Sequence, residues 1–74
     1  MLKLNRVFVE KMKVDESLGT EEIFLKIEEI QSAETIETVN FAGQKTEVTR
    51  IHRHGSLFPI YVKESTMEVL QKMF

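Results

Sequence analysis

The clearest strand signal in the sequence is TIETVNFAGQKTEVTRIHR, residues 35–53, where two runs rich in β-branched residues flank AGQK. β-Branched side chains pack well on a pleated sheet, so both runs favour strands. Gly43 can supply the positive φ that a tight hairpin connection requires. The stretch therefore predicts a β-hairpin.

The residues after this hairpin predict one more strand. A second reversal near His54, Gly55 and Ser56 leads into LFPIYVK, residues 57–63. Pro59 cannot donate a hydrogen bond to a sheet ladder, and it therefore favours the start of a strand or an edge. With the hairpin, this run predicts a β-meander.

The N-terminal segment KLNRVFVEK, residues 3–11, also predicts a strand. Leu2, Leu4 and Phe8 alternate with Val7 and Val9, which would place the two sets on opposite sides. The following segment MKVDESLGTEE, residues 12–22, has the charged and turn-forming composition of a solvated connection. We expect it to contain no core element.

Residues 21–34, EEIFLKIEEIQSAE, fit a helix and a strand. A helix could begin after Thr20 and would line up Ile23, Ile27 and Ile30. A strand would instead alternate Ile23, Leu25 and Ile27 with Glu22, Phe24, Lys26 and Glu28. The β-branched and aromatic residues of the first half favour the strand, and the sequence leaves both open.

The chain ends with its one well-signalled helix, STMEVLQKMF, residues 65–74. Ser65 and Glu68 have the spacing of a capping box, and Met67, Leu70 and Met73 form the expected apolar stripe. We therefore predict a single domain, residues 1–74, of the β-rich α+β class. Its expected form is a small curved antiparallel sheet of four or five strands followed by this helix.

Composition narrows the class of protein. The 74 residues are 42% hydrophobic and 30% charged, as in a folded globular domain, and include no cysteine. Lack of cysteine leaves a reducing cytoplasmic compartment as the simplest expectation. No apolar run reaches the roughly 18 residues of a membrane span, and the N-terminus lacks a signal-peptide centre. The net charge of −2 argues against nucleic acid as a partner.

The run IYVKESTMEVLQKM, residues 60–73, resembles the C-terminal part of the small flagellar and swarming-motility proteins of the FlbD/SwrD family. The matching residues are Val62, Glu64, Ser65, Met67, Glu68 and Val69. Members of that family similarly end in a strand, a V-x-E-S step and a capped helix. The resemblance implies a small motility-related protein with that fold.

A basic stripe is the first candidate site. Arg50, His52 and His54 would share one side of a strand, because side chains alternate with period two. Arginine binds phosphates and carboxylates bidentately, and a bound anion favours protonated histidine. We take these three as candidate ligand-binding residues, with Arg53 and Tyr61 as further contributors. The alternative is a solvated polar strand face, which such a half-exposed strand needs anyway.

The sequence lacks the residues needed for a metal site or a catalytic site. His52 and His54 provide two metal ligands where zinc needs three or four, and no cysteine can complete the set. Asp15 is the single aspartate, and no nucleophile-elbow pattern surrounds any serine. The sequence therefore predicts no catalytic residues, no metal site and no cofactor.

Apolar residues at the C-terminus are the candidate oligomer contact. Met67, Leu70, Met73 and Phe74 leave apolar surface that so small a domain would not cover by itself. We expect a non-catalytic intracellular binding or regulatory module that acts on a protein partner as a homo-oligomer. The alternative is a phage-encoded or host protein that captures a nucleotide-like anion or nucleic-acid phosphate through the basic stripe.

Overall fold

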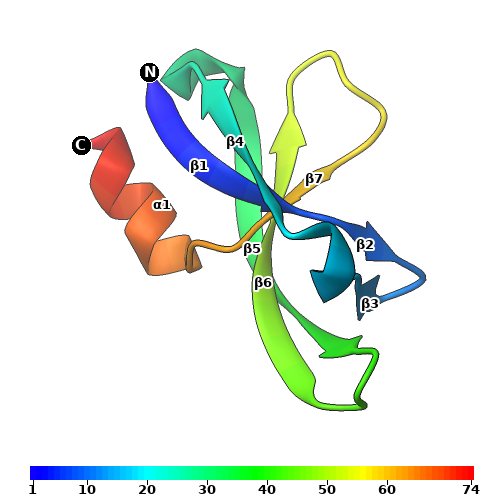
Figure 1. Cartoon of the computed structure of the whole chain (residues 1–74). Coiled ribbons are helices and arrows are strands. Elements are labelled where there is room, and N and C mark those ends of the chain that lie inside the picture. The colour runs from blue at the N-terminus through cyan, green and yellow to red at the C-terminus, as the bar shows by residue number, and fades with distance from the viewer.

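The computed structural model describes residues 1–74 as one seven-stranded sheet with a C-terminal α-helix (Figure 1). The β-rich α+β class is confirmed. Two short 3-10 helices, η1 and η2, interrupt the strands. The elements in chain order are β1 (Leu2–Val7), β2 (Val9–Glu10), β3 (Lys13–Val14), η1 (Glu16–Leu18), β4 (Thr20–Leu25), η2 (Ile27–Glu29), β5 (Ile30–Asn40), β6 (Lys45–Arg53), β7 (Ile60–Val62) and α1 (Thr66–Met73).

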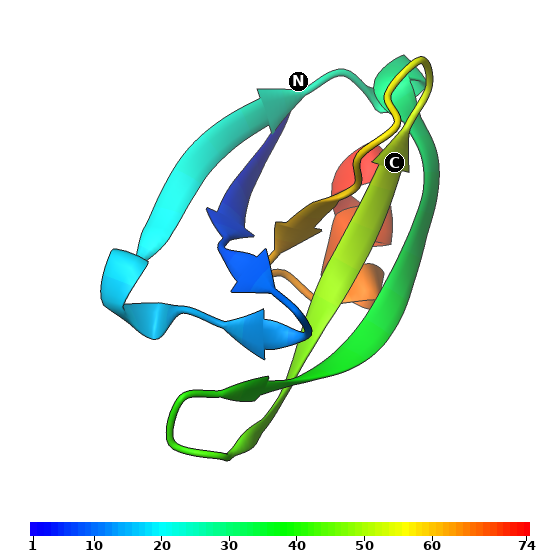
Figure 2. The ribbon, with the colours of Figure 1, turned by 90° about the vertical axis from the view of Figure 1, so that its right-hand side faces the viewer.

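The sheet is strongly curved because β1 and β2, which are consecutive in the chain, lie near opposite ends of its strand order. The strand order is β2-β3-β5-β6-β7-β1-β4, and only Phe8 separates β1 from β2 in the chain. The sheet must therefore curl until β2 lies close to the end of β1, as Figure 2 shows. Neighbouring strands are antiparallel except β3 and β5, which are parallel.

The predicted central hairpin is present as β5 and β6. Its register places Ile36 opposite Val48 and Glu34 opposite Arg50. Gly43 in the connection has a φ of 83°, the conformation for which glycine was expected there. The second reversal also occurs, and β7 then begins immediately after Pro59 and pairs with both β6 and β1. The meander is confirmed.

Two hydrophobic clusters lie on opposite faces of this sheet. Ile60 and Val62 belong to the larger cluster, whereas Tyr61 between them packs against the smaller one. Because side chains alternate along a strand, the two clusters must be on different sides of β7. The larger cluster consists of Leu2, Leu4, Leu25, Ile51, Ile60, Val62 and Val69, and the smaller of Val7, Val14 and Val48.

Residues 21–34 are largely strand. β4 ends at Leu25, the short η2 reverses the chain, and β5 begins at Ile30. β4 pairs along its whole length with β1, which places Leu25 opposite Leu2 and buries Leu25 to 4% exposure. This cross-strand packing selects the strand for this segment, where the sequence alone fits a helix and a strand equally well.

The connection from residue 12 to 22 was wrongly expected to contain no core element. β3 lies in it, and Val14 is a buried member of the smaller cluster. β2 and β3 form a tight hairpin whose two turn residues, Lys11 and Met12, both have positive φ. Neither residue is typical of such a turn, so this hairpin has no local sequence signal. With β2 and β3 included, the sheet has seven strands and is more extensive than the predicted four or five.

The C-terminal helix begins as predicted. The Ser65 side chain accepts a hydrogen bond from the Glu68 backbone N–H at 3.1 Å, and the Glu68 carboxylate accepts one from the Ser65 N–H at 3.3 Å. Val69 is the helix residue that is fully buried, and Met73 of the expected apolar stripe is half-buried, whereas Met67 and Leu70 are exposed. No helix in the structure has both the length and the apolar composition needed to cross a bilayer.

Candidate binding surfaces

Arg50 and His52 do lie on the same face of β6, together with an acidic partner. Arg50 donates from Nε to Glu34 Oε1 at 2.7 Å, and its Nη2 lies 2.6 Å from the same oxygen. His52 Nε2 is 3.4 Å from that oxygen. Glu34 occupies this position because β5 pairs with β6 in a register that sets it opposite Arg50.

The charges of this group compensate one another. The hydrogen bond from Arg50 lowers the pKa of the Glu34 carboxyl, although partial desolvation opposes it. The same hydrogen bond raises the pKa of the Arg50 guanidinium, again against desolvation, and a weaker contribution comes from Tyr61. Tyr61 lies directly opposite Arg50 on β7. The predicted basic stripe is therefore a mixed-charge cluster whose carboxylate takes the place expected for an external anion.

The other two residues of the predicted site lie elsewhere. Arg53 is the last residue of β6 and alternates with His52, so its side chain lies on the opposite face and lines a pocket with Arg6. His54 follows the strand in an exposed turn, where its backbone N–H donates to the Glu29 carbonyl at 2.9 Å. The structure thus brings together Arg50, His52 and Tyr61 but separates Arg53 and His54 from them.

The C-terminal residues predicted to form an oligomer contact are mostly exposed. Met67 is 65% exposed, Leu70 is 44% exposed and Phe74 is 99% exposed. They follow one another at the spacing of a single helix face, and we call this group the helix surface. Met73 differs from them because it is half-buried against the larger cluster.

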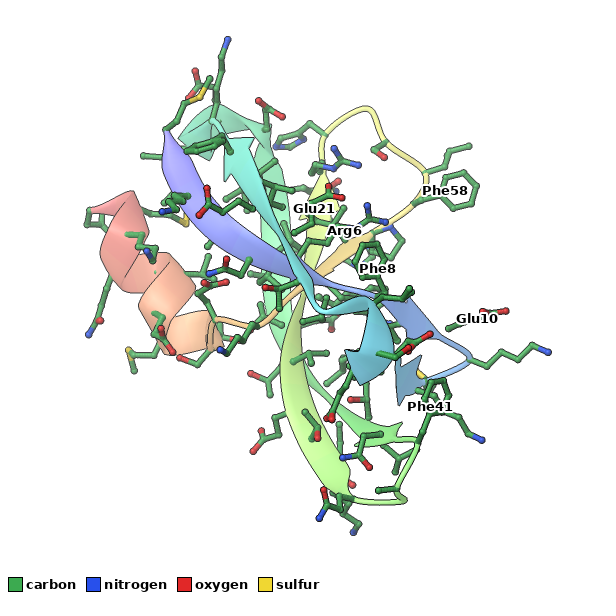
Figure 3. All side chains as sticks on the ribbon, in the orientation of Figure 1. Arg6, Phe8, Glu10, Glu21, Phe41 and Phe58 are labelled. Atoms are coloured by element: carbon green, nitrogen blue, oxygen red, sulfur yellow. The ribbon has the colours of Figure 1, made fainter.

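A second apolar surface surrounds a pocket of about 340 Å³ at the end of the sheet formed by β2 and β3. We call it the aromatic surface, and its apolar members are Phe8, Val9, Leu18 and Phe41. Charged residues of both signs complete the lining: Glu10, Lys11, Lys13 and Asp15. Figure 3 shows Phe8, Phe41 and Phe58 projecting toward the same side of the molecule.

The aromatic surface was missed because its members come from separate segments. Phe8 lies in the single-residue break between β1 and β2, and Phe41 follows the end of β5. Parallel pairing of β3 with the end of β5 brings these segments together, and the β2–β3 hairpin itself was not predicted. One local signal existed, since Phe41 is an aromatic residue inside a tight polar turn, where it has little to pack against.

Arg6 connects the aromatic surface to the rest of β1. Its guanidinium carbon lies 5.0 Å from the centroid of the Phe8 ring, a cation–π distance. Arg6 and Phe8 are two residues apart and therefore share a side of this strand segment. No three His, Cys, Asp or Glu side chains come together in an arrangement that could hold a metal ion. Comparisons of the chain with protein-family models, with curated proteins and with solved structures find no match.

Proposed function

We propose that this chain is a small non-catalytic binding module that acts through protein–protein contacts and associates with copies of itself. The observation that carries the proposal is that none of its five phenylalanines is buried. Eleven large apolar side chains are exposed, whereas ten apolar residues form the buried core. Four of the five phenylalanines are exposed and Phe8 is half-buried; phenylalanine normally contributes to a core, so this exposure favours contacts with other molecules.

The aromatic surface is the proposed contact with a partner. It combines aromatic side chains, a concave centre and a rim of both charge signs, which are common features of protein interfaces. The positive φ values at Lys11 and Met12 add support, because non-glycine residues in this conformation cost free energy and gather at functional sites. The FlbD/SwrD resemblance agrees with a regulatory rather than a catalytic role.

The helix surface is the proposed contact between copies. Met67, Leu70 and Phe74 lie on one side of a helix whose opposite side, at Val69, is held in the core. Burial of an apolar helix face of this kind against a second copy is favourable, because it removes apolar surface from water. Capture of an anion at Arg50 and His52 has less support, because Glu34 already binds both side chains.

Sedimentation velocity at increasing concentration tests the self-association. The wild-type chain should associate with increasing concentration, and the double variant Met67→Ser/Leu70→Ser should remain monomeric. Phe41→Ser is the matched control, because it removes an exposed apolar side chain from the other surface and should leave the assembly intact. A wild-type chain that stays monomeric at the highest concentrations would contradict the proposal.

Affinity capture with two matched variants tests the partner surface. Phe41→Ser should remove any partner that the wild-type chain binds, whereas Leu57→Ser should retain it. Leu57 is 93% exposed, so its replacement controls for loss of surface hydrophobicity alone. Equal retention of the partner by both variants would show that the aromatic surface is not the contact.

A further inference from the structure

A second pocket, of about 490 Å³, is lined by residues of β1, β4, β6 and β7 and is separate from the aromatic surface. Its volume lies in the range of about 300–1,000 Å³ that is usual for small-molecule sites. Four apolar residues form most of its wall: Ile23, Phe24, Leu25 and Ile60. Two arginines, Arg6 and Arg53, also line it.

The alternation of the strands places both arginines at the border of the larger hydrophobic cluster. Arg6 continues the row that begins with the buried Leu2 and Leu4 on β1, and Arg53 continues the row of Ile51 on β6. Each guanidinium therefore lies where an apolar row ends. Two like charges that line one partly apolar pocket repel each other unless an anion lies between them.

Neither guanidinium has an acidic partner. No carboxylate lies within 4.0 Å of Arg6 or Arg53, in contrast with Arg50 and its contact to Glu34. Neither side chain donates a hydrogen bond within the protein, and Arg53 Nε is inaccessible to solvent without any hydrogen-bond partner. A covered donor without a partner is unfavourable, and it shows that the hydrogen bonding of the Arg53 guanidinium is incomplete within the protein.

Two glutamates lie near the pocket, and neither forms an ion pair with Arg6 or Arg53. Glu22 lines it, but its carboxylate lies 3.1 Å from Lys3 Nζ. Glu21 is opposite Arg6 in the pairing of β1 with β4, and Figure 3 shows both side chains in the same region. It nevertheless makes no ion pair within 4.0 Å, so both arginines remain free to bind another acceptor.

We propose that Arg6 and Arg53 bind the carboxylate or phosphate group of a small organic anion, whose apolar portion lies against Phe24 and Ile60. Guanidinium groups suit this role because their planar set of donors matches both oxyanions bidentately. The apolar wall favours a ligand with a hydrocarbon or aromatic part over a free inorganic ion. This site shares no lining residue with the aromatic surface, although Arg6 also contacts Phe8 of that surface.

The test uses benzoate as the probe and benzamide as its uncharged counterpart, followed by amide chemical shifts at low ionic strength. Benzoate should bind with a dissociation constant on the order of 1 mM, because so small a ligand makes few contacts. It should shift the amides of Ile23, Leu25 and Ile60, and benzamide should shift them far less. Added salt should weaken the binding of benzoate.

Three single variants locate the site. Arg6→Gln and Arg53→Gln should each raise the dissociation constant about tenfold or more, since each removes a charged donor. Arg50→Gln is the matched control and should leave binding unchanged, because Arg50 lies on the opposite face and already pairs with Glu34. Dispersed amide spectra of each variant verify that it is folded.

The dependence of binding on pH separates this site from the predicted histidine-containing stripe. Arginine and benzoate both keep their charge between about pH 6 and about pH 8, so affinity should stay constant over that range. Binding at His52 and His54 would instead strengthen at the lower pH. The proposal is overturned if benzoate causes no saturable shifts, if benzamide binds equally well, or if Arg50→Gln weakens binding as much as Arg53→Gln.

Discussion

The Glu64 carboxylate accepts two hydrogen bonds from Asn5, which precedes it by 59 residues in the chain. Oε1 accepts from the Asn5 backbone N–H at 2.9 Å, and Oε2 accepts from Asn5 Nδ2 at 2.8 Å. The Glu64 carbonyl also accepts from Thr49 Oγ1 at 2.7 Å. Glu64 therefore joins β1, β6 and the start of the helix, whereas the sequence identified it only as part of the V-x-E-S step between strand and helix.

We predict that Glu64→Ala lowers the free energy of unfolding by about 2 kcal/mol, since it leaves the half-buried Asn5 donors without their charged acceptor. Urea denaturation measures the change. Glu47→Ala is the control, because Glu47 is exposed and makes no side-chain hydrogen bond or ion pair; it should change stability by less than about 0.5 kcal/mol. Equal effects of the two substitutions would contradict the structural role of Glu64.

The same carboxylate should make stability depend on pH. Burial raises the pKa of Glu64, but the hydrogen bonds from Asn5, together with the Glu64 backbone N–H and the charge of Lys72, outweigh it, and the net pKa is below the ordinary value of 4.5. A depressed pKa stabilises the folded state above pH 4.5, and this contribution is lost as the pH falls below 4.5 through the folded pKa.

Denaturation of the wild-type chain and of Glu64→Gln at neutral and at acidic pH measures this contribution. The difference in stability between them should be largest near neutral pH and should shrink below pH 4.5. The hydrogen bond from Arg50 also lowers the pKa of Glu34. Introducing Glu34→Gln into both the wild-type chain and Glu64→Gln therefore removes the contribution of Glu34 to the pH dependence. A difference between the two chains that is constant over the pH range would rule out the assignment to Glu64.

The sequence predicted the elements whose signals are local and missed those that depend on distant pairing. The β5–β6 hairpin and the start of the helix follow from Gly43 and from the Ser65–Glu68 spacing, which act over a few residues. The burial of Val69, in contrast, depends on where the helix docks, because Met67 and Leu70 are equally apolar. Local pattern cannot distinguish the two faces of so short a helix.

The candidate sites show the same division. Alternation correctly placed Arg50 and His52 on one face, but the register that sets Glu34 opposite Arg50 is a property of the paired strands. Arg6 and Arg53 are 47 residues apart in number and share a pocket only because β7 lies between β1 and β6 in the sheet. No spacing rule connects them.

We predict that Ser65→Ala lowers the free energy of unfolding by about 1 kcal/mol, because the Glu68 N–H loses its capping acceptor. The helix is eight residues long, so its stability depends strongly on this cap and on docking of Val69. Thermal or chemical denaturation measures the effect. Ser32→Ala on β5 is the control, since Ser32 is exposed and should tolerate the change; comparable losses would show that the cap contributes nothing specific.

The turn between β2 and β3 provides the last prediction, in which a substitution stabilises the chain. Lys11 has a φ of 53° and Met12 a φ of 64°, a conformation that is unfavourable for residues with a Cβ atom. Met12 is 47% exposed and contributes little to the core, so Met12→Gly relieves the strain without opening a large cavity. Relief of this strain should raise the free energy of unfolding by about 1 kcal/mol. The greater conformational entropy of glycine in the unfolded chain reduces that gain.

Gly43→Ala is the matched control for this effect, because it makes the reverse exchange at a positive φ. Gly43 has a φ of 83°, and a Cβ atom added there would meet no atom within 4 Å, so its cost would come from the backbone conformation alone. Denaturation midpoints should move in opposite directions for the two variants, upward for Met12→Gly and downward for Gly43→Ala. If Met12→Gly also lowers the midpoint, the positive φ at Met12 is not a source of strain, and the conformation of this turn would lose its value as support for a functional surface beside Phe8 and Phe41.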